Sequence, residues 1–184
     1  MLLPTGAGAP GTIPTPGVEV QGAGWSPEGK RVLYVAASPG RPSRVYVQDL
    51  AGGAPRARTP EGVGGWAVSP DGKFVAGRDE DQRAFLFPVD GGEPLSLPGI
   101  APGEVIVRFD GAGTGLFLFS RALPLRIFRY DIGSGRRETW SEITIADPAG
   151  VEQFNRVVLT PDGKSYAYTF FRALSSLYVV QGLK

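Results

Sequence analysis

One five-residue turn constrains this chain more than any other feature, because the sequence repeats it four times with small changes. The clearest copy is Ser69-Pro70-Asp71-Gly72-Lys73, and it lies between two short apolar runs. Proline fixes φ at about −65° in the second position of a type I turn, and glycine supplies the positive φ that closes the turn into a hairpin. The other copies are residues 26–30, 110–114 and 160–164. Their last glycines lie 43, 41 and 50 residues apart, which predicts a repeat architecture.

A second pattern keeps the same period. In each repeat an aromatic residue stands three positions before an acidic or amide residue: Tyr46 and Asp49, Phe87 and Asp90, Phe128 and Asp131, Tyr178 and Gln181. Each unit therefore reads as strand, hairpin turn, strand, looser loop, strand, glycine-rich turn and short strand. Four antiparallel strands in roughly 40–45 residues are typical of one blade of a β-propeller. No window has sustained helical periodicity, so we expect an all-β chain of about four blades.

The repeat pattern predicts the boundaries of the blades. Blade one covers residues 17–60, blade two 61–97, blade three 98–145, and blade four 146–184, in which the outer strand is missing. The predicted strands are 18–25, 31–36, 44–49, 56–59, 65–68, 74–76, 84–89, 95–97, 105–109, 115–119, 126–130, 137–140, 154–159, 165–170 and 177–180.

Residues 1–16 match the end of a preceding blade or a closing strand, rather than a blade of their own. They would close the ring in the same chain, join two chains into one larger ring, or belong to a longer propeller, which is the alternative we favour. Residues 6–11 also fit a glycine-rich dinucleotide-binding pattern. Pro10, Pro14 and Pro16 exclude the helix that such a site requires.

The charge balance argues against several classes of partner. The chain has 19 basic and 18 acidic residues and a net charge of +1, so it lacks the field that draws proteins to nucleic acid or to membrane surfaces. No segment approaches the roughly 20 apolar residues of a membrane-spanning helix, and no signal peptide is recognisable. We therefore expect no nucleic-acid partner and no membrane insertion.

Two missing residue types limit the chemistry. The chain has no cysteine and no histidine, which removes thiolate nucleophiles, the Ser-His-Asp triad and nearly every zinc site. We expect a protein without catalytic activity, cofactor or metal. Asp79-Glu80-Asp81 is the tightest carboxylate cluster, but it lacks the further oxygen ligands and glycine turn of a calcium site, so we expect a solvated loop.

The four turns resemble the TolB-type, WD-repeat-like propeller repeat of bacteria, whose hallmark is aromatic-Ser-Pro-Asp-Gly-Lys. Residues 25–30 match best, with Glu28 in place of aspartate. Residues 68–73 lack the aromatic residue, 109–114 lack the proline, and 159–164 have threonine in place of serine. The resemblance covers nearly the whole chain and implies a propeller that serves as a sensor or interaction domain.

The last eight residues, 177–184, are also similar to the end of propellers attached to bacterial Ser/Thr protein kinases, although no kinase motif is present. This resemblance implies a place in a signalling protein. The compartment stays open: extracytoplasmic if the propeller is attached to a membrane-bound sensor kinase, and cytoplasmic otherwise.

Aromatic and arginine side chains are the candidate site residues. We expect Trp25, Trp66 and Phe109 to pack between neighbouring blades rather than to contact a ligand, and the four repeat-locked aromatic residues to lie in the blade core. Arginines gather between the second and third strands of the blades, in loops that a ring would bring to one face. The ligand-binding candidates are Arg41, Arg78, Arg83, Arg121 and Arg172, with Arg44 and Arg126 nearby. They would bind carboxylate or phosphate, unless they are surface charges paired with nearby acids.

These observations favour a non-catalytic binding or sensor module that takes a protein, a peptide or a small ligand at one face. One alternative is the gating propeller of a prolyl-oligopeptidase-like hydrolase, which requires a hydrolase domain elsewhere in the protein. The other is a partial propeller that dimerises to cover its exposed edges.

Overall fold

The computed structural model of this protein describes residues 1, 3, 5–176, 178, 181 and 182, except for the side chains of residues 65 and 66. The regular secondary structure of these residues consists of β-strands without any helix, so the predicted all-β class is confirmed. The same residues contain no helix long and apolar enough to cross a membrane.

Fourteen strands make up the described fold. They are β1 (Glu19–Trp25), β2 (Arg31–Ala37), β3 (Arg44–Asp49), β4 (Arg56–Ala57), β5 (Gly64–Val68), β6 (Phe74–Arg78), β7 (Ala84–Pro88), β8 (Leu95–Ser96), β9 (Val105–Phe109), β10 (Gly115–Phe119), β11 (Leu125–Asp131), β12 (Arg137–Ile143), β13 (Val151–Leu159) and β14 (Tyr166–Arg172).

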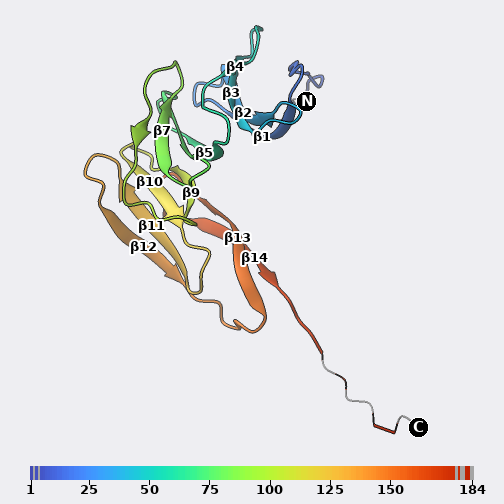
Figure 1. Cartoon of the computed structure of the whole chain (residues 1–184), viewed down its shortest axis with the longest axis vertical. Coiled ribbons are helices and arrows are strands. Elements are labelled where there is room, and N and C mark those ends of the chain that lie inside the picture. Colours follow the sequence, from blue (N-terminus) through green and yellow to red (C-terminus); the bar gives the residue numbers. More distant parts are fainter. Residues whose placement is uncertain (2, 4, 177, 179–180, 183–184) are drawn as a thin grey trace.

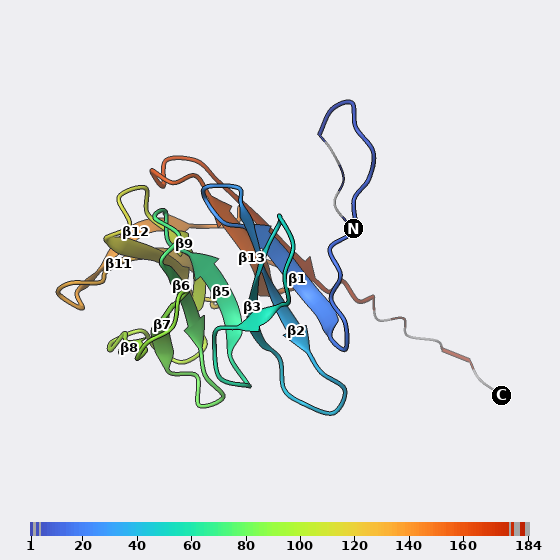
Figure 2. The ribbon, with the colours of Figure 1, turned by 90° about the horizontal axis from the view of Figure 1, so that it is seen from above.

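The strands form separate antiparallel sheets in which each strand pairs with the next one along the chain. Three sheets have four strands, β1–β4, β5–β8 and β9–β12, and the fourth contains β13 and β14. We call these sheets blades one to four. They follow one another along a curved arc (Figure 1), and the view from above shows inner strands β5 and β9 side by side, with β7 and β8 on the outer side (Figure 2). This arrangement is a partial β-propeller.

The repeated turns have the geometry that their sequence predicts. Gly29, Gly72, Gly113 and Gly163 have φ values of 68, 71, 75 and 67°. Each donates its N–H to the carbonyl three residues earlier, at 2.8, 2.9, 3.1 and 2.9 Å. The fourth residue of each turn between an inner strand and a second strand therefore needs to be glycine, because other residues rarely adopt a positive φ.

The faces of the blades pack against one another to form the core. Leu33 and Val35 of blade one meet Val75 of blade two, and separate apolar clusters fill the contacts between blades two and three and between blades three and four. Three of the predicted core aromatics, Tyr46, Phe87 and Phe128, are buried, and so is Phe109 at the end of β9. These predictions are confirmed.

Two aromatic residues differ from expectation. Trp25 is 54% exposed, because it lies beside Val32 on the face of blade one that no blade covers. Tyr178 is 84% exposed and lies outside any strand, so its predicted place in a blade core is wrong. The rest of the predicted strand 177–180 falls on residues outside the described ones, as does the side chain of Trp66.

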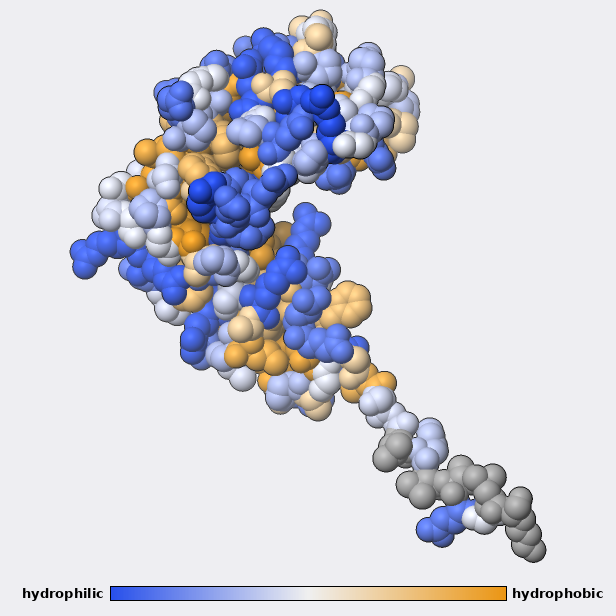
Figure 3. All heavy atoms as spheres, in the orientation of Figure 1, coloured by the Kyte–Doolittle hydropathy of each residue, from blue (hydrophilic) through white to orange (hydrophobic). Residues whose placement is uncertain are grey.

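The two ends of the arc are unlike each other. At blade one, Ile13 packs against the apolar face of the sheet, and the Gln48 side chain donates a hydrogen bond to the Pro14 carbonyl at 3.1 Å. At blade four, Val158 and Phe171 lie exposed on the outer face of the sheet, which has two strands among the described residues. The surface is hollowed between the blade-one end and the lower blades, and apolar surface gathers at the lower end (Figure 3).

Candidate ligand-binding pocket on the loop face

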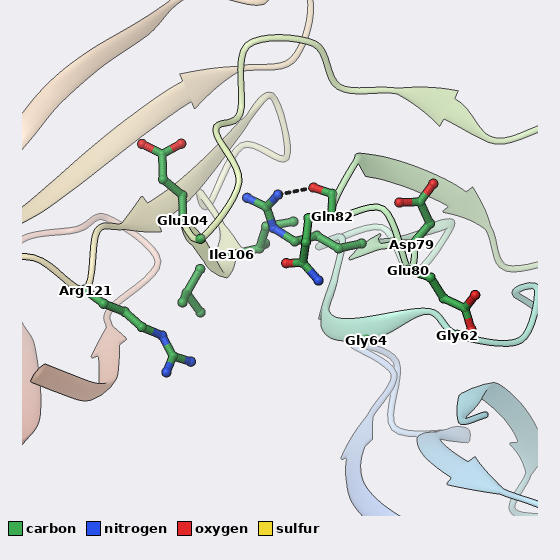
Figure 4. Close-up of a pocket in the computed structure, with 11 residues that line it drawn as sticks. Gly62, Gly64, Asp79, Glu80, Gln82, Glu104, Ile106 and Arg121 are labelled. Atoms are coloured by element: carbon green, nitrogen blue, oxygen red, sulfur yellow. Dashed lines mark hydrogen bonds between the residues drawn. The ribbon is translucent and has the colours of Figure 1, made fainter.

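A pocket of about 410 Å³ lies between blades two and three, on the face that carries the loops joining second and third strands. Its walls come from four connections that are distant in sequence: residues 62–64, the β6–β7 loop, residues 103–106, and Arg121 of the β10–β11 loop. Charged side chains project from several of these walls (Figure 4). The fold therefore assembles this pocket from neighbouring blades.

Arg78, the last residue of β6, is a buried charge in the pocket at 8% exposure. Its guanidinium donates one hydrogen bond to the Gln82 carbonyl at 2.5 Å, the dashed line in Figure 4, and one to the Ala101 carbonyl at 2.9 Å. Its Nε has no hydrogen-bond partner among the described residues. Burial lowers the pKa of Arg78, and the negative charge of Glu104 opposes that effect.

Glu104 stabilises the wall of the pocket that residues 103–106 form. It is 8% exposed, accepts the Ala101 N–H at 2.8 Å, and forms an ion pair with Arg137 at 2.5 Å. The peptide groups of Ala101 are thus held from both sides, by Arg78 at the carbonyl and by Glu104 at the N–H. These bonds give the loop before β9 a defined position at the edge of the pocket.

The acidic β6–β7 loop forms a third wall. Arg83 forms ion pairs with Asp79 at 2.7 Å and with Asp81 at 2.8 Å. Slight burial raises the pKa of Asp79, but the hydrogen bond and charge of Arg83 outweigh it, and the pKa lies below its usual range. Glu80 and Asp81 are exposed, so the predicted solvated loop is what the structure shows.

The five arginine candidates do not form one site. Arg78 and Arg121 line the same pocket. The other three are paired with acids on the surface: Arg41 with Glu61 at 3.0 Å, Arg83 with Asp79, and Arg172 with Asp147 at 3.0 Å. Arg44 and Arg126 likewise pair with Glu61 and Glu142.

Among the polar residues of the pocket, sequence reasoning missed Gln82 and Glu104. Gln82 has a φ of 64°, which places its carbonyl toward Arg78, but no glycine marks this turn in the sequence. Glu104 is set by contacts with Arg137, 33 positions away, and such a distant partner leaves no local signal.

No protein-family model and no curated protein matches this chain. Solved structures that resemble it include two TolB proteins and a prolyl endopeptidase. TolB from Acinetobacter baumannii has a TM-score of 0.66 at 22% identity, covering 86% of this chain and 39% of TolB. A TolB from Agrobacterium tumefaciens has a TM-score of 0.59 at 22% identity, with coverages of 82% and 53%. A prolyl endopeptidase has a TM-score of 0.59 at 19% identity, with coverages of 84% and 26%.

At these identities the similarity concerns the fold alone. The chain spans 39% and 53% of the two TolB structures, which agrees with an arc that is only part of a ring. Its blades are therefore those of a partial, TolB-like β-propeller.

Proposed function

We propose that this chain is a non-catalytic binding module, which takes a protein, a peptide or a small ligand at its loop face. The pocket between blades two and three carries this proposal, because four separate connections converge there around two arginines. Binding residues are commonly found on loops that a rigid scaffold positions, and the stacked blades supply such a scaffold. The proposal requires neither a metal nor a cofactor.

The proposal assigns no reaction to the pocket. Of its three acids, Asp79 and Glu104 are engaged by Arg83 and Arg137, and Glu80 is exposed to solvent. The chain offers no histidine or cysteine as a proton acceptor or nucleophile. A nucleic-acid ligand is disfavoured by the nearly neutral charge of the chain.

The biological setting that we propose is a bacterial signalling protein, such as a sensor linked to a Ser/Thr kinase. The resemblance of the repeats to bacterial TolB supports a bacterial origin. The kinase link rests on the sequence of residues 177–184, most of which lie outside the described residues. It predicts that the same gene encodes a kinase domain.

The structural similarity to a prolyl endopeptidase favours one further candidate, the gating propeller of a prolyl-oligopeptidase-like hydrolase. This function requires a hydrolase domain with its own Ser-His-Asp triad in the same protein. A gene that encodes no hydrolase domain excludes it.

Thermal unfolding in the presence of short peptides, organic acids and sugars tests the binding function. A ligand that binds the folded chain raises its midpoint. We expect at least one compound to raise the unfolding midpoint of the wild type and of Lys30→Glu. The same compound should raise the midpoint of Arg121→Glu much less. Lys30 is a matched control because it lies in the β1–β2 turn, at the opposite end of the strands.

Equal shifts in all three proteins would place the ligand away from this pocket and contradict the proposed site. Chemical conversion of a bound compound by the purified chain, abolished by Arg121→Glu, would contradict the non-catalytic assignment.

A further inference from the structure

Arg78 breaks the pattern of the repeat in which it stands. Six residues after the turn glycine, blade one has Val35 and blade three has Phe119, and both are buried in the apolar contacts between blades. Blade four has Thr169 at this position, and Thr169 is exposed. The same position of blade two is Arg78, whose backbone carries on the β6 strand in the same way. A charged residue at a position where the two other buried copies are apolar is typical of a functional site rather than of a stabilising contact.

The surroundings of Arg78 leave its positive charge without a carboxylate partner. A guanidinium has five N–H donors, and the two hydrogen bonds of Arg78 both end on uncharged backbone carbonyls. The ion pairs among the described residues do not include Arg78. A buried charge in this state is costly, so an anionic group in the pocket would gain a charge-assisted hydrogen bond.

A second cation lies in the same pocket. Arg121 projects from the β10–β11 loop of blade three, across the pocket from Glu80 of blade two (Figure 4). It is exposed, and no ion pair or hydrogen bond holds its side chain within the described part of the chain. Arg121 is therefore available to an incoming ligand from the solvent side.

We propose that this pocket binds a single carboxylate group, held by the unused N–H groups of Arg78 and attracted by Arg121. The proposal rests on the proposed binding function and names its ligand chemistry. A carboxylate fits better than phosphate, because Glu80 and Glu104 in the walls repel a doubly charged anion more strongly. The planar carboxylate also matches the planar guanidinium.

An NMR titration of the 184-residue chain tests this assignment with matched probes. Propionate is compared with propionamide, its neutral analogue, and acetyl-Gly-Glu-Gly-amide with acetyl-Gly-Gln-Gly-amide. Inorganic phosphate is the third anion. We expect both carboxylates to shift the Arg78 Nε–H resonance in a saturable way, and the two amides to leave it unchanged. A purely structural Arg78 would not respond to any of them.

The ratio of the affinity for acetyl-Gly-Glu-Gly-amide to the affinity for propionate indicates the source of the carboxylate. A peptide that binds at least tenfold more tightly than propionate indicates a protein or peptide ligand. Equal affinities indicate a small organic acid. Both results support the carboxylate assignment.

Variants separate the two arginines. Arg78→Val installs the residue that blade one has at this position, so we expect a folded protein that has lost carboxylate binding by about tenfold or more. Arg121→Ala should weaken binding about threefold and leave the fold intact. Lys30→Ala, in the turn at the opposite end of blade one, should bind as the wild type does. Because Arg121 is exposed, Arg121→Ala should fold, and it therefore tests carboxylate binding at this pocket even if Arg78→Val does not fold.

Three results would overturn the inference: no saturable shift with either carboxylate, equal shifts with the amides, or tighter binding of phosphate than of propionate. If other compounds bind in a manner that depends on Arg121 while the carboxylates do not, the ligand chemistry proposed here is wrong and the binding function of the pocket stands.

Discussion

Gln82 occupies a backbone conformation that normally requires glycine. It is the non-glycine residue with a positive φ, 64°, in the described part of the chain, and it donates its N–H to the Asp79 carbonyl at 3.0 Å. A side chain in this region costs about 1–2 kcal/mol, which the contact of its carbonyl with Arg78 helps to offset. The strain therefore lies directly beside the proposed carboxylate site.

Replacing Gln82 with glycine tests this strain. We expect Gln82→Gly to raise the free energy of unfolding by about 0.5–1 kcal/mol, because the relief of φ strain exceeds the entropy cost of glycine. Urea unfolding measures the change. As a control, Gly29→Ala should lower stability by about 1 kcal/mol for backbone reasons alone, since a Cβ at Gly29 meets no neighbour within 4 Å. A lower stability of Gln82→Gly would contradict the account.

Asp71 gives the second turn a pH dependence. Its carboxylate accepts hydrogen bonds from the Ser69 hydroxyl at 2.6 Å and from the Lys73 N–H at 3.1 Å, and these bonds hold its pKa below the usual range. A carboxyl with a lowered folded-state pKa stabilises the protein at neutral pH. That stabilisation is lost as the pH falls through the folded-state pKa.

We therefore expect Asp71→Asn to be less stable than the wild type at pH 7, and to lose less stability when the pH is lowered from about 6 to about 3. Thermal unfolding across this pH range measures both effects. Glu93→Gln serves as the control, because Glu93 is exposed and has no ion pair among the described residues. Identical pH profiles for Asp71→Asn and the wild type would refute this role.

At the scale of the element, the third hairpin turn shows how an altered repeat is kept in place. Residues 110–114 lack the proline of the other turns, yet Gly113 keeps its positive φ. The Asp110 carboxylate accepts two hydrogen bonds from Arg129 of β11, at 2.7 and 3.2 Å, and one from the Thr114 N–H at 3.0 Å. The ion pair between Arg129 and Asp110 thus stabilises a turn whose own sequence lacks the usual proline.

Truncating Arg129 should therefore destabilise the protein more than truncating a neighbouring arginine. We expect Arg129→Ala to cost about 1–3 kcal/mol, because it leaves the buried Asp110 carboxylate without its cation. Arg126→Ala, on the same strand, should cost less than about 1 kcal/mol, since its pair with Glu142 is about half exposed. Equal costs in urea unfolding would show that the pair does not support the turn.

The sequence predicts the elements well where turns and apolar runs coincide. The strands β3, β9 and β10 have the bounds predicted from sequence, because each is a mainly apolar run that lies next to a turn signal. Some strands are longer than predicted: β6 continues to Arg78, and β13 begins at Val151. Others are shorter, such as β4, which ends at Ala57. Polar residues continue a strand through backbone hydrogen bonds, which an apolar pattern does not report.

At the scale of the whole molecule, the repeat predicts how many blades there are but not what meets across them. Trp25 illustrates the limit, since its exposure depends on which blade face is covered. The pocket illustrates it again, because Arg78 and Arg121 stand 43 positions apart and meet only through the packing of blade two on blade three. The sequence identified Arg78 and Arg121 as candidates from their positions between second and third strands. Only the structure shows that the other three candidates, Arg41, Arg83 and Arg172, are paired with acidic residues.

The open face of blade four decides whether the whole molecule associates with another propeller segment. In blades one to three the corresponding face packs against the next blade, whereas in blade four Val158 and Phe171 are 47% and 59% exposed. Exposed apolar faces and unpaired edge strands favour association with another sheet. The chain is therefore expected to need a further propeller segment, from a longer protein or from a second copy, to cover this face.

Light scattering at several protein concentrations tests the central claim, that the chain is a partial propeller with an open end. We predict a solution mass that rises with concentration for the wild type, and a mass close to the 19.5 kDa of one chain for Phe171→Glu, whose charge blocks the face. A wild-type chain that stays monomeric at every concentration and unfolds in one cooperative step would contradict the claim, because it would mean that the arc is complete as it stands.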